Sequence, residues 1–510
     1  MLKISQRDVK RGKIPKTIVF NFFCFSDCLY GLHRNGPPSL PVYGAYWIVL
    51  ANKFNNLAVS FLKFGSKYKT KIVGLYLGPY PTIVINDSAM IKEMLNLEEM
   101  DGRMDIILGR LRAYWKKLGI FFTDGYFWQI QRRFSLRYMR DYGFGRRDES
   151  LENVVETEVK EMIDMVTHGA QNTEEKKIVK GDLIYLPHYF SVPFINGLLY
   201  VFSRMTLPRT RYQVLWDMTT YSLLFQRNSN DLGAALSITP WLKDFLPSFS
   251  GYNGLRKGNQ YLLDFFTVIR ATEDSKYSRN FIDLYNKQMK KELDKDGRST
   301  FSEEQLVLTC TDYMFPTASA VETVLTMLIE RILIQPEIQE RVHEEIDRVV
   351  GKGRLPNLDD RKNMPYTECC IREMMRHETL VPLGVPHRSM SDVEFHGYVI
   401  PENTVVSANF VGLHMDKEIW GDPENFRPER FIVDGKLDLS KDKSLPFGAG
   451  RRLCAGETFA RQTMFQVFAG FMQAFNVSTA DGRPLMKVSG RIQGIITTIP
   501  EFWVKVTPRS

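Results

Sequence analysis

The segment around Cys454 constrains this chain more than any other part of it. From Phe447 it runs Phe-Gly-Ala-Gly-Arg-Arg-Leu-Cys-Ala-Gly, and an apolar helical pattern from Glu457 to Ala474 follows directly. Glycines at 448 and 450 allow backbone conformations that other residues avoid. We therefore expect a tight loop that presents the cysteine at the amino end of a helix.

The residue types around Cys454 favour a reactive thiolate. A helix amino terminus and a nearby cation such as Arg452 both lower the pKa of a thiol. We expect Phe447 to shield the sulfur from water and Gly456 to let the following helix approach closely. The alternative is a structural cysteine in a glycine-rich turn. Average residue usage produces this pattern by chance in about one chain in 10⁴, which makes that alternative the weaker one.

Composition bounds the class of protein. The chain has 510 residues and a net charge of +8 that is spread along the sequence, so nucleic acid is not an expected partner, whereas anionic lipid or an acidic protein is. Six cysteines in this length, two of them adjacent, form no disulfide framework and indicate a reducing compartment. No pair of CxxC motifs supports a zinc site.

Residues 1–35 form a basic leader whose apolar run, residues 18–25, is far shorter than the ~20 residues that span a bilayer. It is either a shallow membrane anchor or a poorly ordered extension. The proline-rich segment 36–41 predicts a stiff hinge. Because no linker or repeat interrupts the rest, we expect one catalytic domain over residues 42–510.

Hydrophobic periodicity predicts a mainly α protein with small β-sheets. A Gly-Pro turn predicts a β-hairpin over residues 70–86. Ser302 and Gln305 form a capping box that starts a long helix. Further helices are expected at 337–350, 366–378 and 457–474, and short strands at 392–399, 405–408 and 502–506.

Four motifs in this order resemble the cytochrome P450 family, from about Gly36 to the end of the chain. Besides the Cys454 loop they are Trp128-Gln-Ile-Gln-Arg132, Glu373-Met-Met-Arg376 and Phe426-Arg-Pro-Glu-Arg430-Phe431. The sequence of the Cys454 loop is most similar to the animal microsomal branch of the family, insect members especially. The resemblance implies the cytochrome P450 fold, with haem between a long central helix and the cysteine loop.

The resemblance also implies roles for individual residues. Cys454 would be the axial thiolate ligand of haem b, iron protoporphyrin IX, a ligation that favours O–O cleavage. The haem contacts it implies are Trp128, Arg132, His387, Phe447, Gly450, Arg452 and Gly456. Without the resemblance, His387 could equally be a core histidine.

Glu373 and Arg376 lie at i,i+3 and so share one helix face. The resemblance implies that Arg430 joins them in a buried cluster that locks the core beneath the haem. Taken alone, the pair would more often be an exposed ion pair.

The sequence departs from the family on the oxygen-side helix, where an acid and an alcohol usually help to deliver protons. An ungapped alignment puts Ser319 at the acid position and Ala320 at the alcohol position, after Pro316 and Thr317. Glu322 and Thr323 look like the missing pair but lie three residues late. Pro316 deprives the Asp312 carbonyl of its helical partner. The resulting kink is either a water-holding notch or a feature without function.

Proton delivery could then fall to Thr317, Ser319, ordered water or a substrate hydroxyl. By family analogy the substrate pocket draws on apolar side chains. The candidates are Leu111, Phe121, Phe315 and Val381. Such a pocket suits steroid-, terpenoid- or xenobiotic-like molecules.

The sequence therefore predicts a monooxygenase that inserts one oxygen atom from O2 into a lipophilic, hormone-like or foreign substrate. Electrons would come from NADPH through NADPH-cytochrome P450 reductase, with cytochrome b5 as a second candidate partner. The alternatives are an isomerase or dehydratase acting on a peroxide without external electrons, and a non-enzymatic carrier of apolar ligands. The expected location is the cytosolic face of the endoplasmic reticulum membrane, with mitochondria as the alternative.

Overall fold

The computed structural model describes residues 16–17, 40, 43–52, 56–228, 236–237, 239–271, 279–293, 299–480 and 490–509. The predictions for the leader at 1–35 and the hinge at 36–41 therefore lie almost entirely outside the described residues.

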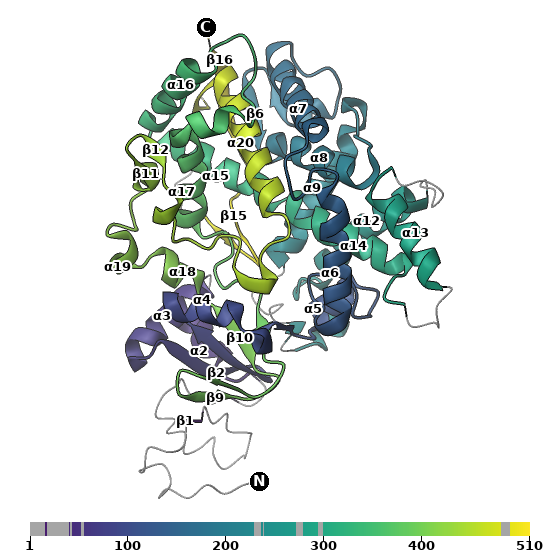
Figure 1. Cartoon of the computed structure of the whole chain (residues 1–510), viewed down its shortest axis with the longest axis vertical. Coiled ribbons are helices and arrows are strands. Elements are labelled where there is room, and N and C mark those ends of the chain that lie inside the picture. The colour runs from purple at the N-terminus through teal and green to yellow at the C-terminus, as the bar shows by residue number, and fades with distance from the viewer. Residues whose placement is uncertain are drawn as a thin grey trace, which may run out of the picture.

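Helices dominate the described chain, as the sequence predicts (Figure 1). The α-helices are α2 (Tyr46–Asn52), α3 (Leu57–Tyr68), α4 (Ser88–Asn96), α5 (Ile107–Arg112), α6 (Gly125–Arg140), α7 (Glu149–Thr167), α8 (Ser191–Ser203), α9 (Tyr212–Asn228), α11 (Leu242–Phe245), α12 (Tyr252–Ala271), α13 (Phe281–Leu293), α14 (Glu303–Thr317), α15 (Ala320–Ile334), α16 (Glu337–Val349), α17 (Pro365–Glu378), α18 (Phe410–His414), α19 (Lys417–Trp420) and α20 (Glu457–Ala474).

The strands are short and form small sheets. They are β1 (Lys16–Thr17), β2 (Ile72–Leu77), β3 (Tyr80–Ile85), β4 (Gly102–Arg103), β5 (Val179–Lys180), β6 (Leu183–Leu186), β7 (His387–Arg388), β8 (Val393–Phe395), β9 (Tyr398–Ile400), β10 (Val405–Ala408), β11 (Ile432–Val433), β12 (Lys436–Leu437), β13 (Phe475–Thr479), β14 (Ile492–Gln493), β15 (Thr497–Thr498) and β16 (Phe502–Pro508).

The largest sheet has the order β2-β3-β10-β7-β4 and lies at the end of the molecule that carries α2, α3 and α4 (Figure 1). The predicted hairpin supplies β2 and β3, and β10 pairs parallel to β3 with Val405 beside Thr82. β7 pairs with both β10 and β4, which brings His387 beside Arg103. This sheet thus joins two of the segments that form the site.

The single strand expected at 392–399 is wrong. The segment is a hairpin, β8 and β9, with His396 and Gly397 in the turn, both at positive φ. Such angles suit a tight turn between antiparallel strands. A histidine at the first turn position concealed the signal, because Asn or Asp is the usual residue there.

The central helix is broken rather than kinked. Ser302 caps α14 by accepting the N–H of Gln305 at 3.1 Å. The Gln305 side chain instead bonds the backbone of Gly119, so only half of the expected capping box forms. α14 ends at Thr317, just after Pro316, and α15 begins at Ala320 with Ser319 outside both helices at φ −146°. Pro316 removes the donor to the Asp312 carbonyl one turn earlier. At the break itself, the Ser319 hydroxyl donates to the carbonyl of Phe315, which the Ser319 N–H would reach in a continuous helix, and that N–H donates to the carbonyl of Pro316 instead.

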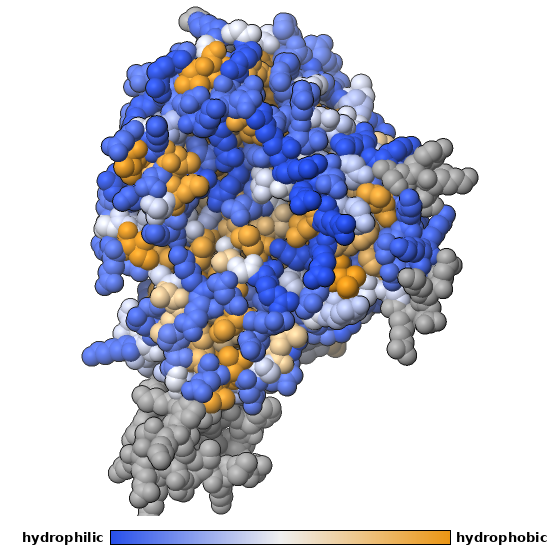
Figure 2. Space-filling model, in the orientation of Figure 1, coloured by the Kyte–Doolittle hydropathy of each residue, from blue (hydrophilic) through white to orange (hydrophobic). Residues whose placement is uncertain are grey.

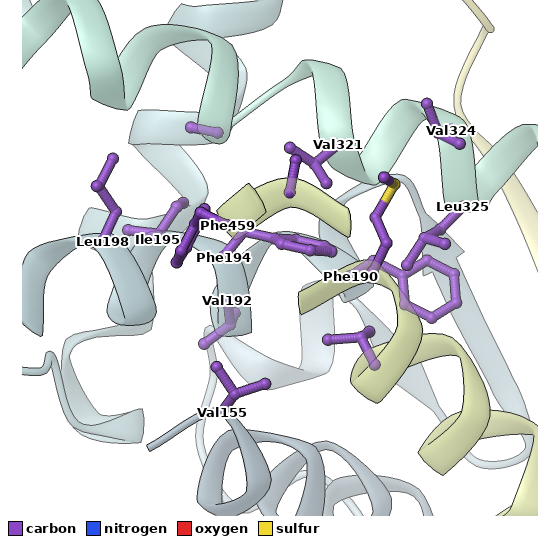
Figure 3. Close-up of a cluster of buried hydrophobic side chains, with 14 of the residues drawn as sticks. Val155, Phe190, Val192, Phe194, Ile195, Leu198, Val321, Val324, Leu325 and Phe459 are labelled. Atoms are coloured by element: carbon purple, nitrogen blue, oxygen red, sulfur yellow. The ribbon is translucent and has the colours of Figure 1, made fainter. Parts of the chain in front are cut away.

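Four helices meet in the main hydrophobic core. Side chains of α7, α8, α15 and α20 interdigitate there, including Val155, Phe194, Val321 and Phe459 (Figure 3). α20 contacts α7 on one side and α17 on the other. The cysteine loop precedes α20, so this core fixes the position of the loop. Among the described residues, no helix is long and apolar enough to cross a membrane.

Phe194 tests this core, because its side chain is fully buried in α8. Phe194→Ala should lower the free energy of unfolding by about 3–5 kcal/mol through lost burial and a residual cavity. Urea denaturation followed by circular dichroism measures the change. Phe249→Ala is the control, since Phe249 is 83% exposed and its truncation should cost under about 0.5 kcal/mol. Equal effects in the two variants would contradict the packing described.

Candidate active site

A large cavity lies between the broken central helix and the loop that precedes α20. It encloses about 1750 Å³ of empty space, its opening to solvent included. Thr317 and Ala320 line it from the helix side, and Phe447 and Cys454 line it from the loop side. Of the four cysteines in the described residues, Cys454 alone lines the cavity, and it is exposed there while the other three are buried.

The loop around Cys454 is held by its own backbone and by α4. The N–H of Cys454 donates to the carbonyl of Phe447 at 2.9 Å, which closes the turn. Gly450 has φ +67°, and a Cβ there would lie 1.9 Å from the carbonyl oxygen of Leu95. Gly448 is also left-handed, at φ +74°, but a Cβ there would meet open space. Close approach to α4 is therefore the requirement specific to Gly450.

Gly456 caps α20, and a Cβ there would meet Phe144 at 3.4 Å, an ordinary contact. The expected close helix approach is thus not what this glycine provides. Its N–H instead donates to the Cys454 sulfur and lowers the pKa of that thiol. Although Cys454 borders the cavity, desolvation by the surrounding protein outweighs this and raises the pKa of its thiol, so a bound cation such as iron would favour the thiolate.

Arg452 is not the cation that acts on Cys454. Its guanidinium donates to the carbonyls of Asp101 and Thr123 at 2.9 and 3.0 Å, and lies 3.6 Å from the centre of the Trp128 ring. The cations that lower the pKa of Cys454 are Arg132, which donates to the carbonyl of Leu453, and Arg461. The prediction that Arg452 holds the thiolate is therefore wrong, because its side chain turns toward the segment before α6.

Three guanidinium groups line one side of the cavity, from Arg103, Arg132 and Arg452. Burial lowers the pKa of Arg103 to about 10 and of Arg452 to about 8, so both would be stabilised by an anion. Trp128 also lines the cavity, and its Nε1 is buried without a hydrogen-bond partner among the described residues. This donor set, facing a single cysteine, fits the carboxylates of haem. Sequence reasoning missed Arg103, which belongs to no motif.

His387 lines the same side of the cavity and is buried. Its Nδ1 bonds the carbonyl of Met100 at 2.7 Å, so Nδ1 carries the proton and Nε2 of the neutral ring is an acceptor. Donation from Nε2 to a carboxylate would need the imidazolium. Burial, Arg103 and Arg452 hold the pKa of His387 well below its usual range, which disfavours that form.

The oxygen-side residues are placed differently from expectation. Thr317 lines the cavity but donates its hydroxyl to the carbonyl of Tyr313 at 2.8 Å. Ala320 lines the cavity with no polar group. Ser319 does not line it: its hydroxyl donates to Phe315 O at 2.9 Å and accepts from the Gln226 amide at 3.1 Å. The prediction of Ser319 as a catalytic residue is wrong in this geometry, because the helix break turns it toward α9.

Glu322 and Thr323 do not take the missing positions either. Neither lines the cavity, and Thr323 donates its hydroxyl to the carbonyl of Ser319 at 2.5 Å. Glu322 is fully buried, and burial raises the pKa of its carboxyl well above the usual range. Glu322 and Thr323, three residues after the expected acid and alcohol positions, therefore do not reach the cavity in the folded structure either.

Of the expected substrate contacts, Phe121, Phe315 and Val381 line the cavity. Phe315 packs edge-on against Phe225 with ring centres 4.3 Å apart. Leu111 does not line the cavity but packs into a second hydrophobic cluster, so this prediction is wrong. Its neighbour Arg112, the last residue of α5, faces the cavity instead.

The structure brings Glu373, Arg376 and Arg430 together. Arg376 bonds both carboxylate oxygens of Glu373, at 2.8 and 2.7 Å, and Arg430 bonds one of them at 2.9 Å. Glu373 and Arg376 are fully buried, and the Arg430 side chain is 5% exposed. Trp420 lies against both guanidinium groups.

His414 links this cluster to the cysteine loop, a role that no sequence motif indicated. Arg376 donates to the carbonyl of His414 at 2.8 Å, and the N–H of Leu445 donates to His414 Nε2 at 3.1 Å. Because Nε2 accepts, Nδ1 carries the proton and donates to Thr379 Oγ1 at 3.0 Å. Burial and Arg376 lower the pKa of His414 to about 3, so it stays neutral and keeps accepting.

Comparisons with known proteins agree with this geometry. A family model described as "Cytochrome P450" matches residues 35–506. Farnesoate epoxidase of Bombyx mori is 28% identical, with 96% of this chain and 98% of that protein covered. Probable cytochrome P450 303a1 of Drosophila melanogaster is 31% identical, covering 80% and 81%, and cytochrome P450 2B2 of Rattus norvegicus is 30% identical, covering 93% and 94%.

Alanine substitutions at Gly448 and Gly450 distinguish the effect of close packing against α4 from the effect of backbone strain. Alanine at either position meets a left-handed φ, at roughly 1–2 kcal/mol. Only Gly450→Ala also drives a Cβ into Leu95, so it should yield protein with little or no haem, whereas Gly448→Ala should retain most of it. The ratio of Soret to protein absorbance in purified protein measures this. Equal haem contents would show that contact with α4 does not position the loop.

The buried cluster predicts that two glutamates of neighbouring motifs, Glu373 and Glu429, differ in their effect on folding and haem content. Glu373→Ala leaves two buried guanidinium groups uncompensated and should cost roughly 3–5 kcal/mol, giving haem-free, poorly folded protein. Glu429→Ala is the matched control, because Glu429 lies in the same motif as Arg430 but forms a partly exposed pair with Arg341. Normal haem content in Glu373→Ala would refute the role of the cluster.

Proposed function

This chain belongs to the cytochrome P450 family and is accordingly a haem-dependent monooxygenase, and we propose that Cys454 is the axial ligand of its haem b. One observation carries the proposal: Cys454 alone among the described cysteines lines the cavity, at the amino end of α20. Arg103, Arg132, Arg452 and Trp128 would hold the haem carboxylates. When bound, haem with a thiolate ligand supplies the activation of O2.

Proton delivery is proposed to run through water at the helix break. Ala320 has no hydroxyl, and the Thr317 hydroxyl is engaged with Tyr313. Pro316 lines the cavity and leaves the Asp312 carbonyl without its helical donor. A carbonyl that lacks its helical donor and borders a cavity can accept a hydrogen bond from water. This device would replace the acid and alcohol that the family places here.

Electrons are proposed to come from NADPH through a reductase, with cytochrome b5 as a further donor. Arg133, Arg137 and Arg140 are exposed on α6, at the i, i+4 and i+7 positions of one face. The same helix carries Arg132, which contacts the cysteine loop. This basic stripe suits an acidic partner that docks on the Cys454 side.

The substrate is proposed to be lipophilic, of terpenoid, steroid or foreign origin. Phe121, Phe122, Phe315 and Val381 give the cavity a largely apolar wall. The Bombyx mori relative is, by its name, an epoxidase of farnesoate, a lipophilic compound. An apolar wall binds such molecules through the burial of their surface.

Exposed aromatic side chains support attachment to a membrane surface, and we propose that the enzyme lies on the cytosolic face of the endoplasmic reticulum. Phe245 and Phe249 are 75% and 83% exposed, and Trp241 is exposed beside them. Leu242 of the same segment packs into one hydrophobic cluster with Tyr46 of α2, next to exposed Trp47. Figure 2 shows apolar side chains gathered at this end of the molecule, over α2 and β2. Such a patch fits a lipid interface.

The absorption spectrum of the reduced, carbon-monoxide-bound protein tests the proposal. A strongly red-shifted Soret band is expected in the wild type and should be lost in Cys454→Ala, because a thiolate ligand would cause the shift. Substrate oxidation should then depend on NADPH and a reductase. A histidine-like band would overturn the ligand assignment. Conversion of an organic hydroperoxide without NADPH would support the isomerase alternative, which the missing alcohol at Ala320 favours.

A further inference from the structure

Two ionic side chains face the oxygen side of the cavity, Arg112 at the end of α5 and Asp312 on α14. They form an ion pair across 200 residues of sequence, with side chains 5% and 0% exposed. The pair is far from the loop of Cys454 in the sequence, and the haem carboxylates are already matched by Arg103, Arg132 and Arg452. Arg112 is therefore available for a role other than binding the haem carboxylates.

Asp312 is fully provided with donors. Its Oδ1 accepts from Arg112, and its Oδ2 accepts from the backbone N–H groups of Ile120 and Phe121 at 2.6 and 3.0 Å. Its negative charge is therefore shared between the guanidinium and two amides. The Arg112 guanidinium keeps the capacity to bind a second anion.

Arg112 is not fully provided with acceptors. Its Nη1 is buried and has no hydrogen-bond partner among the described residues. A buried donor without a partner is costly, most of all when it is charged. The other polar groups on this side are engaged: Thr317 donates to Tyr313 O, and Gln226 donates to Ser319. Within the described part of the chain the Gln226 Oε1 also has no partner, but it is a neutral acceptor and would select a donor instead.

The surroundings of Arg112 are apolar. The guanidinium lies 5.5 Å from the centre of the Phe122 ring, and Phe121 and Phe315 continue the wall. A ligand that satisfies both parts needs an oxygen anion at one end and a hydrocarbon body. We propose that the substrate is a lipophilic carboxylic acid whose carboxylate binds Arg112. This inference rests on the proposed function, since it names the substrate class of the same cavity.

The test is equilibrium dialysis of the haem-loaded enzyme without NADPH. Lauric, palmitic and farnesoic acids are each compared with their own methyl esters, which keep the hydrocarbon body and lose the charge. For at least one pair, wild type should bind the acid about tenfold or more tightly than the ester, because a charge-assisted hydrogen bond is lost in the ester.

The variant is Arg112→Met combined with Asp312→Asn, which removes both charges while the amide oxygen still accepts from Ile120 and Phe121. The ratio of acid to ester affinity should fall to about one. Arg110→Met is the matched control on the same helix, because Arg110 is partly exposed, pairs with Asp105 and does not line the cavity. Its ratio should match the wild type. If the double variant lacks haem, Arg112→Lys replaces it, since lysine keeps the charge without the fork and should lower the ratio.

Wild type that binds none of the acids more tightly than its ester would overturn the proposal, as would an acid preference that survives removal of Arg112. Dialysis needs neither electrons nor turnover. Failure of the NADPH assay would therefore overturn the proposed function while an acid preference lost with Arg112 stands. If the enzyme oxidises neutral lipids normally but shows no preference for acids over esters, the proposed function stands and the carboxylate proposal is overturned.

Discussion

The buried cluster around Glu373 is the interaction on which the haem side of this enzyme depends. One carboxylate oxygen accepts from Arg376, from Arg430 and from the N–H of Arg427, so three donors converge where no water reaches. Arg376 also donates to the carbonyl of His414, and the His414 ring accepts from the segment that leads into the cysteine loop. Each group alone would be costly to bury, and together they tie α17, α18 and the loop into one body.

The broken central helix shapes the other wall of the cavity. α14 ends at Thr317, α15 restarts at Ala320, and the residues between them leave the helical path. The break turns Ser319 away from the cavity and leaves an apolar residue where the family has an alcohol. Under the proposal above, water at the Asp312 carbonyl, which Pro316 leaves without its helical donor, takes the place of that alcohol in proton delivery.

Much of this architecture follows from local sequence patterns. The helix at 457–474 was predicted to the residue, and the strand at 405–408 likewise, because their periods and boundary residues agree. The site residues that were predicted wrongly depend instead on the direction in which a side chain points after folding. Leu111 and Arg112 are neighbours, and the direction in which α5 ends decides which of them faces the cavity. Arg452 was expected at the sulfur, but its long side chain found acceptors near α6 instead.

The sequence by itself singled out Cys454, paired Glu373 with Arg376 at i,i+3 and predicted a disturbed helix at Pro316, since covalent spacing and backbone chemistry act within a turn or two. Only the tertiary structure decided that Arg103 faces the cavity, that His414 supports the loop, and that Arg112 meets Asp312. Arg112 and Asp312, for example, lie 200 residues apart in the chain. Their geometry depends on how helices pack, and packing sums many weak contacts that no short motif records.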